Sequence, residues 1–279
     1  MNLKPSEVDP LIETALAEDL PAGDITSESV IPADSVSRAI FLAKEAGVLA
    51  GIGIARRVFQ KIDPRIRFKR FCQDGQAFKP GDILAEVRGN SISLLKGERT
   101  ALNFLQRMSG IATKTRLFVD AVAGTRTRIL DTRKTTPSLR RLEKYAVRMG
   151  GGTNHRFSLS DMVLLKDNHL RLVGSISRAV RLAKEKTRPG TKVEVEAANF
   201  AQAKEALAAG ASMVMLDNMP IGRMRPVVRA LAGRIPIEAS GRVSLRRSRQ
   251  IAALGVDFIS VGGLTHSFSS VDISLEFLE

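Results

Sequence analysis

Cationic side chains gather in the middle of the chain, each beside an apolar run or a group of glycines. Arg133 and Lys134 follow one short apolar run, Lys166 closes another, and His155 and Arg156 come just after three glycines. A buried cation without a partner costs several kcal/mol, so these positions indicate an anionic ligand. Arginine offers a planar fork for carboxylate or phosphate, lysine a point charge, and neutral histidine a single donor. A solvated basic face is the alternative, and it explains the flanking strands and glycines less well.

Two carboxylates, Glu196 and Asp217, stand at the ends of later apolar runs. In the alternating stretch from Glu194 to Glu196 both glutamates point to the same side, so at least one must face the barrel interior or its mouth. For Glu196 the alternative is a surface or capping carboxylate. Two carboxylates without a histidine or cysteine cluster match Mg²⁺, which binds through one or two carboxylates and substrate phosphates.

Small residues form two later loops, Ser240-Gly241 and Gly262-Gly263. Glycines let backbone N–H groups approach a phosphate closely, and the helix N-termini that follow add a favourable dipole. Together with the cations and carboxylates, these loops predict a site for a phosphorylated, metal-bound sugar beside a small acidic molecule.

Composition limits the classes of molecule that are expected to bind at this site. The chain has 43 lysines and arginines against 29 acidic residues, a net charge of +14, which suits either nucleic acid or a small polyanionic substrate. The absence of tryptophan and the single tyrosine argue against nucleic acid, which is bound with interleaved aromatics. One cysteine, Cys72, excludes an intramolecular disulfide and suits a reducing cytoplasm. Since no apolar run would span a bilayer and no signal peptide is recognisable, we expect a cytoplasmic protein without membrane contact.

The first third of the chain predicts an α+β region dominated by antiparallel pairing. Asp9 and Pro10 are expected to start a short helix that ends near Asp19. Residues 65–71 alternate as a strand should, and a further strand is expected to meet a turn at Gly89-Asn90. A helix over 98–111 should bridge two domains, with the boundary near Gly110.

Beyond residue 111 apolar runs alternate with helical stretches, which is typical of βαβ units and a parallel sheet. Every candidate residue beyond this point lies at or after the C-terminal end of an expected strand. In a β/α barrel these ends share the face that carries the active site, whereas a doubly wound sheet should show an early Gly-rich phosphate turn. Strands are expected at 127–130, 162–165, 192–195, 213–216, 235–237 and 258–261, and helices at 139–149, 176–185, 201–209, 224–232 and 245–254.

The ordered motifs DTRKTTPSLRRLEKYAVRMGGGTNHR, LLKDNH, VEVE, MLDNM, EASG and GVDFISVGGLTHS closely resemble the quinolinate phosphoribosyltransferase family. EDLPAGDITS and GERTALNFLQRMSGIAT resemble its other signatures, so the resemblance covers nearly the whole chain. It implies an α/β protein with an N-terminal α+β open-sandwich domain, residues 1–110 with the bridging helix, and an incomplete α/β (TIM-like) barrel, residues 111–279. The extreme C-terminus could pack back on the first domain. The family assembles as a homodimer with its active site at the subunit interface, and a higher oligomer stays open.

The resemblance also implies a reaction. Phosphoribosyl pyrophosphate and quinolinate would react with Mg²⁺ to give nicotinate mononucleotide, pyrophosphate and CO2 for NAD synthesis. Glu196 and Asp217 would hold the ribose hydroxyls and the metal, and Arg99 would reach in from the neighbouring subunit. The implied catalytic residues are Arg133, Lys134, Lys166, Glu196 and Asp217, and the implied substrate-binding residues are Arg99, Thr132, His155, Arg156, Ser240, Gly241, Gly262 and Gly263.

The sequence departs from the family pattern at three positions. Arg242 stands where the family usually has a second glycine after EASG. Gly263 stands where alanine is common in the family, and Ser138 where glycine is frequent. Arg242 either adds a phosphate contact or points to solvent. Two other functions stay open: a paralogue of the molybdenum-transport-associated type with another acceptor, and a basic nucleic-acid-binding protein in which Glu196 and Asp217 would have no purpose.

Overall fold

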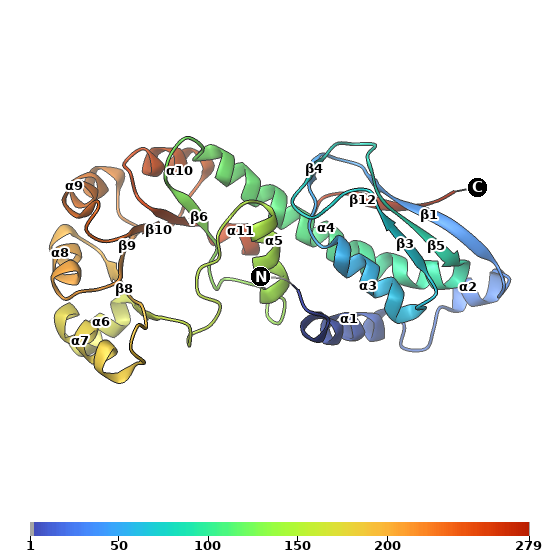
Figure 1. Cartoon of the computed structure of the whole chain (residues 1–279), viewed down its shortest axis with the longest axis horizontal. Helices are drawn as coiled ribbons and strands as arrows, with labels where there is room; N and C mark the ends of the chain where they lie inside the picture. The colour runs from blue at the N-terminus through green and yellow to red at the C-terminus, as the bar shows by residue number, and fades with distance from the viewer. Residues whose placement is uncertain (1–2, 279) are drawn as a thin grey trace. The chain divides into compact units, whose positions relative to one another are not determined.

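Two main sheets, one antiparallel and one parallel, organise the chain in the computed structural model, which describes residues 3–278 (Figure 1). The residues divide into two compact units that are not continuous in sequence. The first unit comprises the described residues of Met1–Arg116, Thr135–Gly151 and Ser267–Glu279, and the second comprises Leu117–Lys134 and Gly152–His266. All of the expected strand-end residues therefore belong to the second unit.

The first unit is built on a four-stranded sheet in the order β12-β1-β5-β3. Its strands are β1 (Val36–Ala43), β3 (Arg67–Arg70), β5 (Ile83–Asn90) and β12 (Ile273–Leu278), and all three pairings are antiparallel. A small pair, β2 (Gly47–Val48) and β4 (Ala77–Phe78), lies apart from this sheet. Because β12 pairs with β1, the last described strand completes the N-terminal sheet.

Aromatic side chains fill the space between this sheet and the helix α3 (Ile52–Ile62). Phe41 on β1 and Phe59 on α3 are fully buried, and their ring centroids lie 6.1 Å apart in an edge-to-face arrangement. Phe68 on β3 completes the cluster at 5.8 Å from Phe41. Burial of Phe41 and Phe59, with the half-buried Phe68 beside them, contributes several kcal/mol, which fixes the α3 face against the sheet.

The first helix, α1 (Pro5–Asp19), begins earlier than expected. The prediction that Asp9 and Pro10 start it was wrong, because Pro5 already occupies the first turn, where a missing N–H costs nothing. Asp9 instead points toward α3, where its carboxylate lies 2.6 Å from Arg57 and 2.9 Å from Lys61. The short α2 (Ile25–Val30) follows, capped by the Asp24 carboxylate, which accepts the Thr26 and Ser27 N–H groups.

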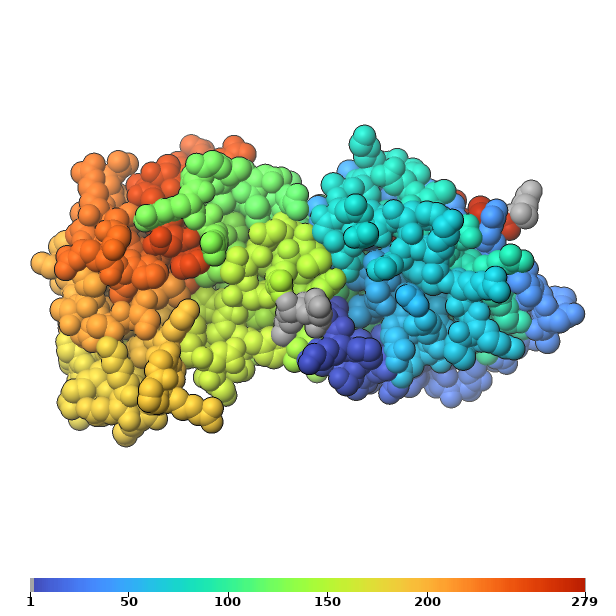
Figure 2. Space-filling model, in the orientation of Figure 1, coloured from blue at the N-terminus to red at the C-terminus, as the bar shows by residue number. Residues whose placement is uncertain are grey.

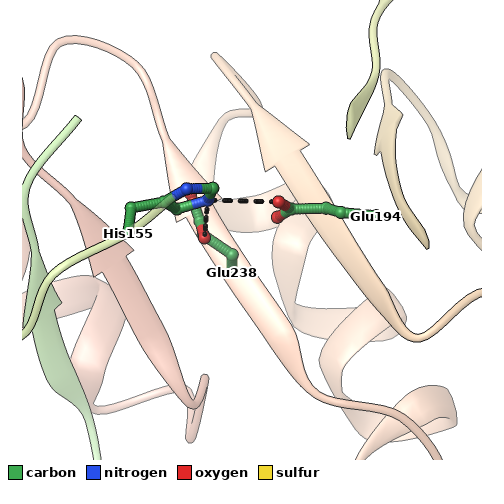
Figure 3. A group of neighbouring side chains, drawn as sticks. All are labelled: His155, Glu194 and Glu238. Carbon is green, nitrogen blue, oxygen red and sulfur yellow. Dashed lines mark hydrogen bonds and ion pairs between the residues drawn. The ribbon is translucent and has the colours of Figure 1, made fainter. Parts of the chain in front are cut away.

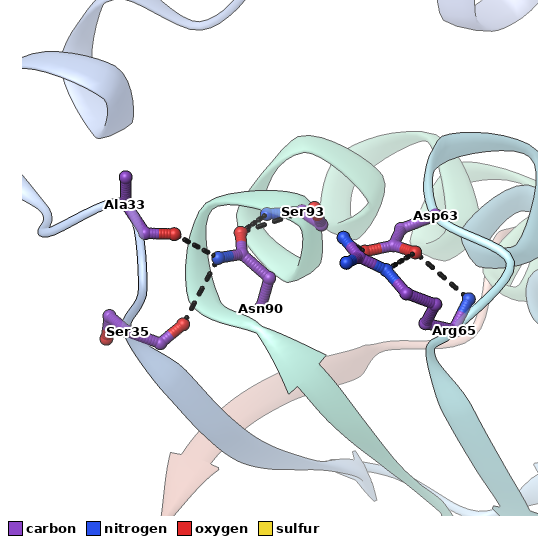
Figure 4. A network of polar contacts seen from close by, with 6 residues as sticks. All are labelled: Ala33, Ser35, Asp63, Arg65, Asn90 and Ser93. Atoms are coloured by element: carbon purple, nitrogen blue, oxygen red, sulfur yellow. Dashed lines mark hydrogen bonds and ion pairs between the residues drawn. The ribbon is translucent and has the colours of Figure 1, made fainter.

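A second correction concerns Gly89-Asn90, which forms no turn between strands. β5 runs through these residues directly into α4 (Ser91–Ala121), so residues 91–95 are helical and the expected helix over 98–111 is longer at both ends. Asn90 explains the start of α4, since its Oδ1 accepts the Ser93 N–H at 3.1 Å and its Nδ2 donates to the Ala33 carbonyl at 2.7 Å (Figure 4).

The second unit is built on a six-stranded parallel sheet in the order β6-β11-β10-β9-β8-β7. Five of the expected strands are confirmed to within two residues at each end, whereas the strand expected at 235–237 begins at Ile237 and runs on to Ser240. The sheet is open, with β6 and β7 at its edges, as an incomplete barrel requires. Its strands are β6 (Arg128–Leu130), β7 (Val163–Leu165), β8 (Val193–Ala197), β9 (Met213–Asp217), β10 (Ile237–Ser240) and β11 (Phe258–Ser260).

Helices cover the outside of this sheet, and they form much of the surface of the unit on the side that Figure 2 shows. Four of them follow the expected pattern: α7 (Ile176–Lys186), α8 (Phe200–Ala208), α9 (Ile221–Leu231) and α10 (Leu245–Ala252). The short helices α6 (Asp167–Val173) and α11 (Gly263–His266) were not expected, because neither is long enough to show a period. The expected helix over 139–149 is α5 (Arg140–Met149), which belongs to the first unit.

Among residues 3–278, no helix combines the length and apolar character needed to cross a bilayer. Even α4, with 31 residues, carries charged side chains throughout its length.

Candidate functional site

A pocket of about 770 Å³ opens at the C-terminal ends of the parallel strands of the second unit. Such ends form one face because every strand of a parallel sheet runs the same way. The pocket collects side chains from the loops after all six strands. Its lining residues are Thr132, Arg133, Lys134, His155, Arg156, Leu164, Lys166, Glu196, Met215, Asp217, Asn218, Glu238, Ser240, Gly241, Arg242, Val243, Ser260, Val261, Gly262, Gly263 and His266.

The loop after β6 presents Arg133 and Lys134 to this pocket. The Thr132 hydroxyl accepts the Lys134 N–H at 3.0 Å, and the Thr265 hydroxyl donates to the Lys134 carbonyl at 2.8 Å. These two contacts hold the backbone of Lys134, so the loop keeps both cationic residues beside the pocket. Lys166 reaches the same pocket from the end of β7, where its side chain is exposed.

His155 and Arg156 lie in an irregular segment that a buried carboxylate holds in place. Asp131, fully buried after β6, accepts the His155 N–H at 2.8 Å and an Asn154 side-chain N–H at 2.5 Å. The Arg156 guanidinium donates to the Met162 carbonyl at 3.1 Å. Burial and the nearby charge of Arg133 lower the pKa of Arg156. The two guanidinium groups repel each other, and a bound anion would reduce this repulsion.

The floor of the pocket contains His155 between two buried glutamates, one on β8 and one on β10 (Figure 3). His155 Nε2 lies 3.1 Å from Glu194 Oε2 and 3.3 Å from Glu238 Oε2. Both glutamate side chains are fully buried, and the Ser260 hydroxyl donates to the other oxygen of Glu238. Glu194 is thus an interior member of the alternating stretch on β8.

This histidine cluster retains a proton. Burial alone would lower the pKa of His155, but the Glu194 and Glu238 carboxylates raise it to about 10. Burial also raises the pKa of Glu194 to about 7. The Arg156 N–H points at His155 Nδ1 at 2.7 Å and favours a lone pair there, so this contact opposes the doubly protonated ring that the two carboxylates favour.

The contact between the Arg156 N–H and His155 Nδ1 also affects whether this cluster could bind a metal. His155, Glu194 and Glu238 have ligand atoms within 4.8 Å of one another, as a metal site would require. A metal on Nε2 would need the ring proton on Nδ1, where the Arg156 N–H already points. This contact therefore disfavours a metal on Nε2, and it orients the His155 ring together with the two glutamates.

Glu196 and Asp217 form a second acidic pair at the ends of β8 and β9. Burial, then the charge of Asp217, raise the pKa of Glu196 to about 7, so the two carboxyl groups repel each other across the pocket wall. A divalent cation relieves such repulsion, and two carboxylates beside a phosphate site are the donor set that Mg²⁺ accepts. The residues present therefore fit this metal.

Two glycines contribute to the remaining walls, and at each of them neighbouring atoms lie close to the position that a Cβ atom would take. A Cβ atom on Gly241 would lie 2.2 Å from Asn218 Oδ1, and its φ of +94° is one that side chains rarely adopt. A Cβ on Gly262 would lie 3.0 Å from Lys134 Cδ. With Ser240 and Gly263, these positions leave backbone close to the pocket, as phosphate binding requires.

Of the residues implied as site members, all but one line this pocket. Arg99 lies on α4 in the first unit. The sequence interpretation missed the roles of three residues: Glu238 and His266, which line the pocket, and Glu194 below it. A charged residue inside a β-like run, as in Val193-Glu194-Val195 and Ile237-Glu238-Ala239, is the signal that marks the two glutamates.

Comparison with known proteins gives a family for both parts of the chain. The family model described as quinolinate phosphoribosyl transferase, C-terminal domain, matches residues 111–276, and the N-terminal domain model matches residues 24–109. Among curated relatives, the probable nicotinate-nucleotide pyrophosphorylase [carboxylating] of Synechocystis is 42% identical over 97% of this chain and 92% of its own length. That of Bacillus subtilis is 41% identical over 95% of this chain and 92% of its own.

Solved structures agree with these matches. NadC from Streptococcus pyogenes superposes with a TM-score of 0.96 at 41% identity and covers all of both chains. The nicotinate-nucleotide pyrophosphorylase from Pyrococcus furiosus shares only 18% identity but superposes with a TM-score of 0.75 over 99% of this chain and 78% of its own, which shows the common fold.

Proposed function

This chain belongs to the quinolinate phosphoribosyltransferase family, and we infer that it transfers a phosphoribosyl group to quinolinate with decarboxylation. The substrates are quinolinate and phosphoribosyl pyrophosphate, and the products are nicotinate mononucleotide, pyrophosphate and CO2. The enzyme is accordingly a pentosyltransferase of NAD biosynthesis. The single cysteine suits a cytoplasmic location, which we include in the proposal.

The observation that carries this proposal is the charge arrangement of the pocket. Four cations, Arg133, Lys134, Arg156 and Lys166, share one cavity with the acidic pair Glu196 and Asp217. Quinolinate is a dianion and the sugar donor is a polyphosphate, so the cations capture and orient both. A pocket that bound only nucleic-acid phosphates would gain nothing from the two carboxylates.

The same arrangement supports the reaction. As the bond from ribose C1 to pyrophosphate lengthens, C1 becomes positively charged, and the carboxylates of Glu196 and Asp217 stabilise it while Lys134 and Lys166 stabilise the departing anion. The ring nitrogen of quinolinate then forms a bond to C1. The resulting pyridinium accepts the electron pair released when the adjacent carboxylate leaves as CO2, and water supplies the proton that replaces it. No general base is required, which agrees with the occupied nitrogens of His155.

Mg²⁺ belongs to the proposal as a cofactor. Glu196 and Asp217 would hold it, directly or through substrate oxygens, and when bound it would neutralise charge on the leaving pyrophosphate. Support comes from the position of the two carboxyl groups: burial, and after it the charge of Asp217, raises the pKa of Glu196.

We also propose that the active enzyme is a homodimer in which Arg99 of one subunit serves the pocket of the other. Support comes from the resemblance of GERTALN to the family signature. A third guanidinium would complete the set that holds the two carboxylates of quinolinate.

The test of the proposed acceptor is a comparison of kcat/KM for quinolinate and nicotinate with phosphoribosyl pyrophosphate and Mg²⁺. A pocket built for a dianion should favour quinolinate by at least about 100-fold, because nicotinate lacks the second carboxylate that the pocket cations would bind. Equal use of both acceptors, or turnover of nicotinate alone, would overturn the assignment.

A further inference from the structure

A loop of residues 157–162 connects Arg156, which lines the pocket, to the start of β7. The carboxylate of Asp161 closes this loop, because its Oδ2 accepts the Phe157 N–H at 2.6 Å and the Ser158 N–H at 3.2 Å. Both N–H groups directly follow Arg156 in the chain, so the loop is held at the point where it leaves the pocket. Aspartate suits this position, since its short side chain readily accepts hydrogen bonds from nearby backbone.

Ser158 adds a further link to the same carboxylate. Its hydroxyl donates to Asp161 Oδ1 at 2.7 Å and accepts the Ser160 N–H at 3.1 Å. Both oxygens of Asp161 therefore accept hydrogen bonds from this loop, and bonds to an ionised group are stronger than bonds between neutral groups. Asp161 is itself exposed, so its replacement would remove these bonds without leaving a cavity in the core.

The Arg156 guanidinium contacts the other end of the loop. Its Nη1 donates to the Met162 carbonyl at 3.1 Å, while the same side chain lines the pocket. A guanidinium carries its donors in one rigid plane, so a donor bound to Met162 also fixes the direction of the others. That direction depends on where the Met162 carbonyl lies, and therefore on the closure of the loop.

Charge also connects Asp161 with Arg156. Burial, and after it the charge of Arg133, lower the pKa of Arg156. The charge of Asp161 acts in the opposite direction, as does that of Glu194. Asp161 therefore favours the charged form of the arginine, as an opposite charge nearby does. Because Asp161 is outside the set of residues that line the pocket, it does so without presenting a carboxylate to an anionic ligand.

We propose that Asp161 is a positioning residue, which orders the loop of residues 157–162 and so sets the Arg156 guanidinium for the anionic acceptor before it binds. The identity of that acceptor, quinolinate, rests on the proposed function, whereas the closure of the loop does not. Without Asp161, binding would have to order both the loop and a long side chain with many rotamers, and this cost would lower the affinity.

The first test compares steady-state kinetics of the full chain with those of Asp161→Ala, Ser158→Ala and, as a matched control, Asp120→Ala. Asp120 is an exposed aspartate on the part of α4 that belongs to the second unit. Asp161→Ala should raise KM for quinolinate about tenfold and change kcat by less than about threefold, because the ordering cost falls on binding. Ser158→Ala, the milder change, should raise this KM about threefold, and Asp120→Ala less than about twofold.

A double-mutant cycle separates positioning from a general loss of structure. Asp161→Ala is combined with Arg156→Lys, which keeps the charge of the side chain but not its planar fork. If Asp161 acts through the guanidinium, Asp161→Ala should change KM for quinolinate by less than about twofold in this background. An effect as large as in the wild-type background would overturn the positioning role.

Hydrogen exchange of the free protein tests the closure of the loop without any substrate. The Phe157 and Ser158 N–H groups should exchange at least about tenfold faster in Asp161→Ala than in the wild type, and at the wild-type rate in Asp120→Ala. Unchanged exchange in Asp161→Ala, or faster exchange with an unchanged KM for quinolinate, would overturn the proposal. A wild-type protein that uses no quinolinate would contradict the proposed function, and the exchange rates alone would then decide whether Asp161 holds the loop.

Discussion

Arg133 is the residue whose position argues most directly for an anionic substrate. Its side chain lies in the pocket directly after a buried strand, on a loop that Thr132 and Thr265 hold in place. Arg133→Ala should therefore lower kcat/KM more than 100-fold, which corresponds to a loss of about 3 kcal/mol of transition-state stabilisation, while the protein stays folded. Arg128→Ala, at the exposed opposite end of β6, is the matched control and should leave turnover unchanged. Near-normal turnover by Arg133→Ala would remove this residue from the site.

Glu238 contacts His155, so we expect it to affect the reaction by positioning that ring. Replacing it with glutamine keeps the size and an acceptor but removes one carboxylate from the contact with Nε2. We expect Glu238→Gln to raise KM for quinolinate about fivefold to tenfold, roughly 1 kcal/mol, with a smaller effect on kcat. Glu238→Ala should cost more, because it also leaves the Ser260 hydroxyl without its acceptor. If glutamine and alanine at this position give the same kinetics as the wild type, Glu238 does not position the histidine.

Residue types and spacing were enough to predict which side chains meet in the pocket. Arg133, Lys166, Glu196 and Asp217 could be grouped because each follows an apolar run, and strand ends share a face. The interior glutamates could not be paired with His155 from spacing, because that contact depends on which strands become neighbours. Arg242 could not be placed either, since its backbone conformation is set by Asn218 and the Gly241 loop.

At the scale of elements, the pairing of α1 with α3 depends on a charged cluster. The Arg57 hydrogen bond, together with Lys61, holds the pKa of Asp9 well below its usual value of 3.8. Because the folded pKa is depressed, the stabilisation is present above about pH 3.8 and is lost as pH falls below it. The unfolding midpoint of the wild type should therefore fall more steeply than that of Asp9→Asn between pH 5 and pH 2.

The control for this prediction is Asp34→Asn, since Asp34 is exposed and forms no ion pair within the described part of the chain. Its midpoint should follow the wild type at every pH. Parallel curves for Asp9→Asn and the wild type would contradict the role of the cluster.

Helix α4 depends on a glycine that other backbone approaches closely. A Cβ on Gly110 would lie 2.1 Å from the Ser269 carbonyl oxygen, so Gly110→Ala should destabilise the first unit by about 3 kcal/mol. Gly53 on α3 has nothing within 4 Å of such an atom, and Gly53→Ala should instead stabilise by about 0.5–1 kcal/mol. Chemical unfolding of both variants measures the contrast, and a stable Gly110→Ala would mean that the two segments are not packed in this way.

The start of α4 could not be predicted from the sequence pattern. Asn90 resembles a turn residue, but its side chain accepts the Ser93 N–H and donates to the Ala33 carbonyl, which makes it the start of a helix. The strands of the second unit were predicted more accurately, because a buried parallel strand is apolar throughout and stands out from its neighbours.

For the whole molecule, the proposed dimer makes a prediction about mixed subunits. Arg99→Ala and Lys134→Ala chains should each be inactive alone, but a hybrid dimer would contain one pocket with both residues intact. After subunit exchange at equal amounts, activity should recover to about a quarter of the wild-type value, because half of the dimers are hybrids with one working site. No recovery after exchange has been verified by mass would show that Arg99 does not act across subunits.

The most direct measurement is a turnover experiment with quinolinate labelled in the carboxylate next to the ring nitrogen. In the presence of phosphoribosyl pyrophosphate and Mg²⁺, we predict that labelled CO2 and nicotinate mononucleotide appear in a one-to-one ratio, with no label in the nucleotide. The Lys134→Ala protein should release neither. A folded wild-type protein that releases no CO2 from quinolinate, or that retains the label in the nucleotide, would contradict the decarboxylating transfer.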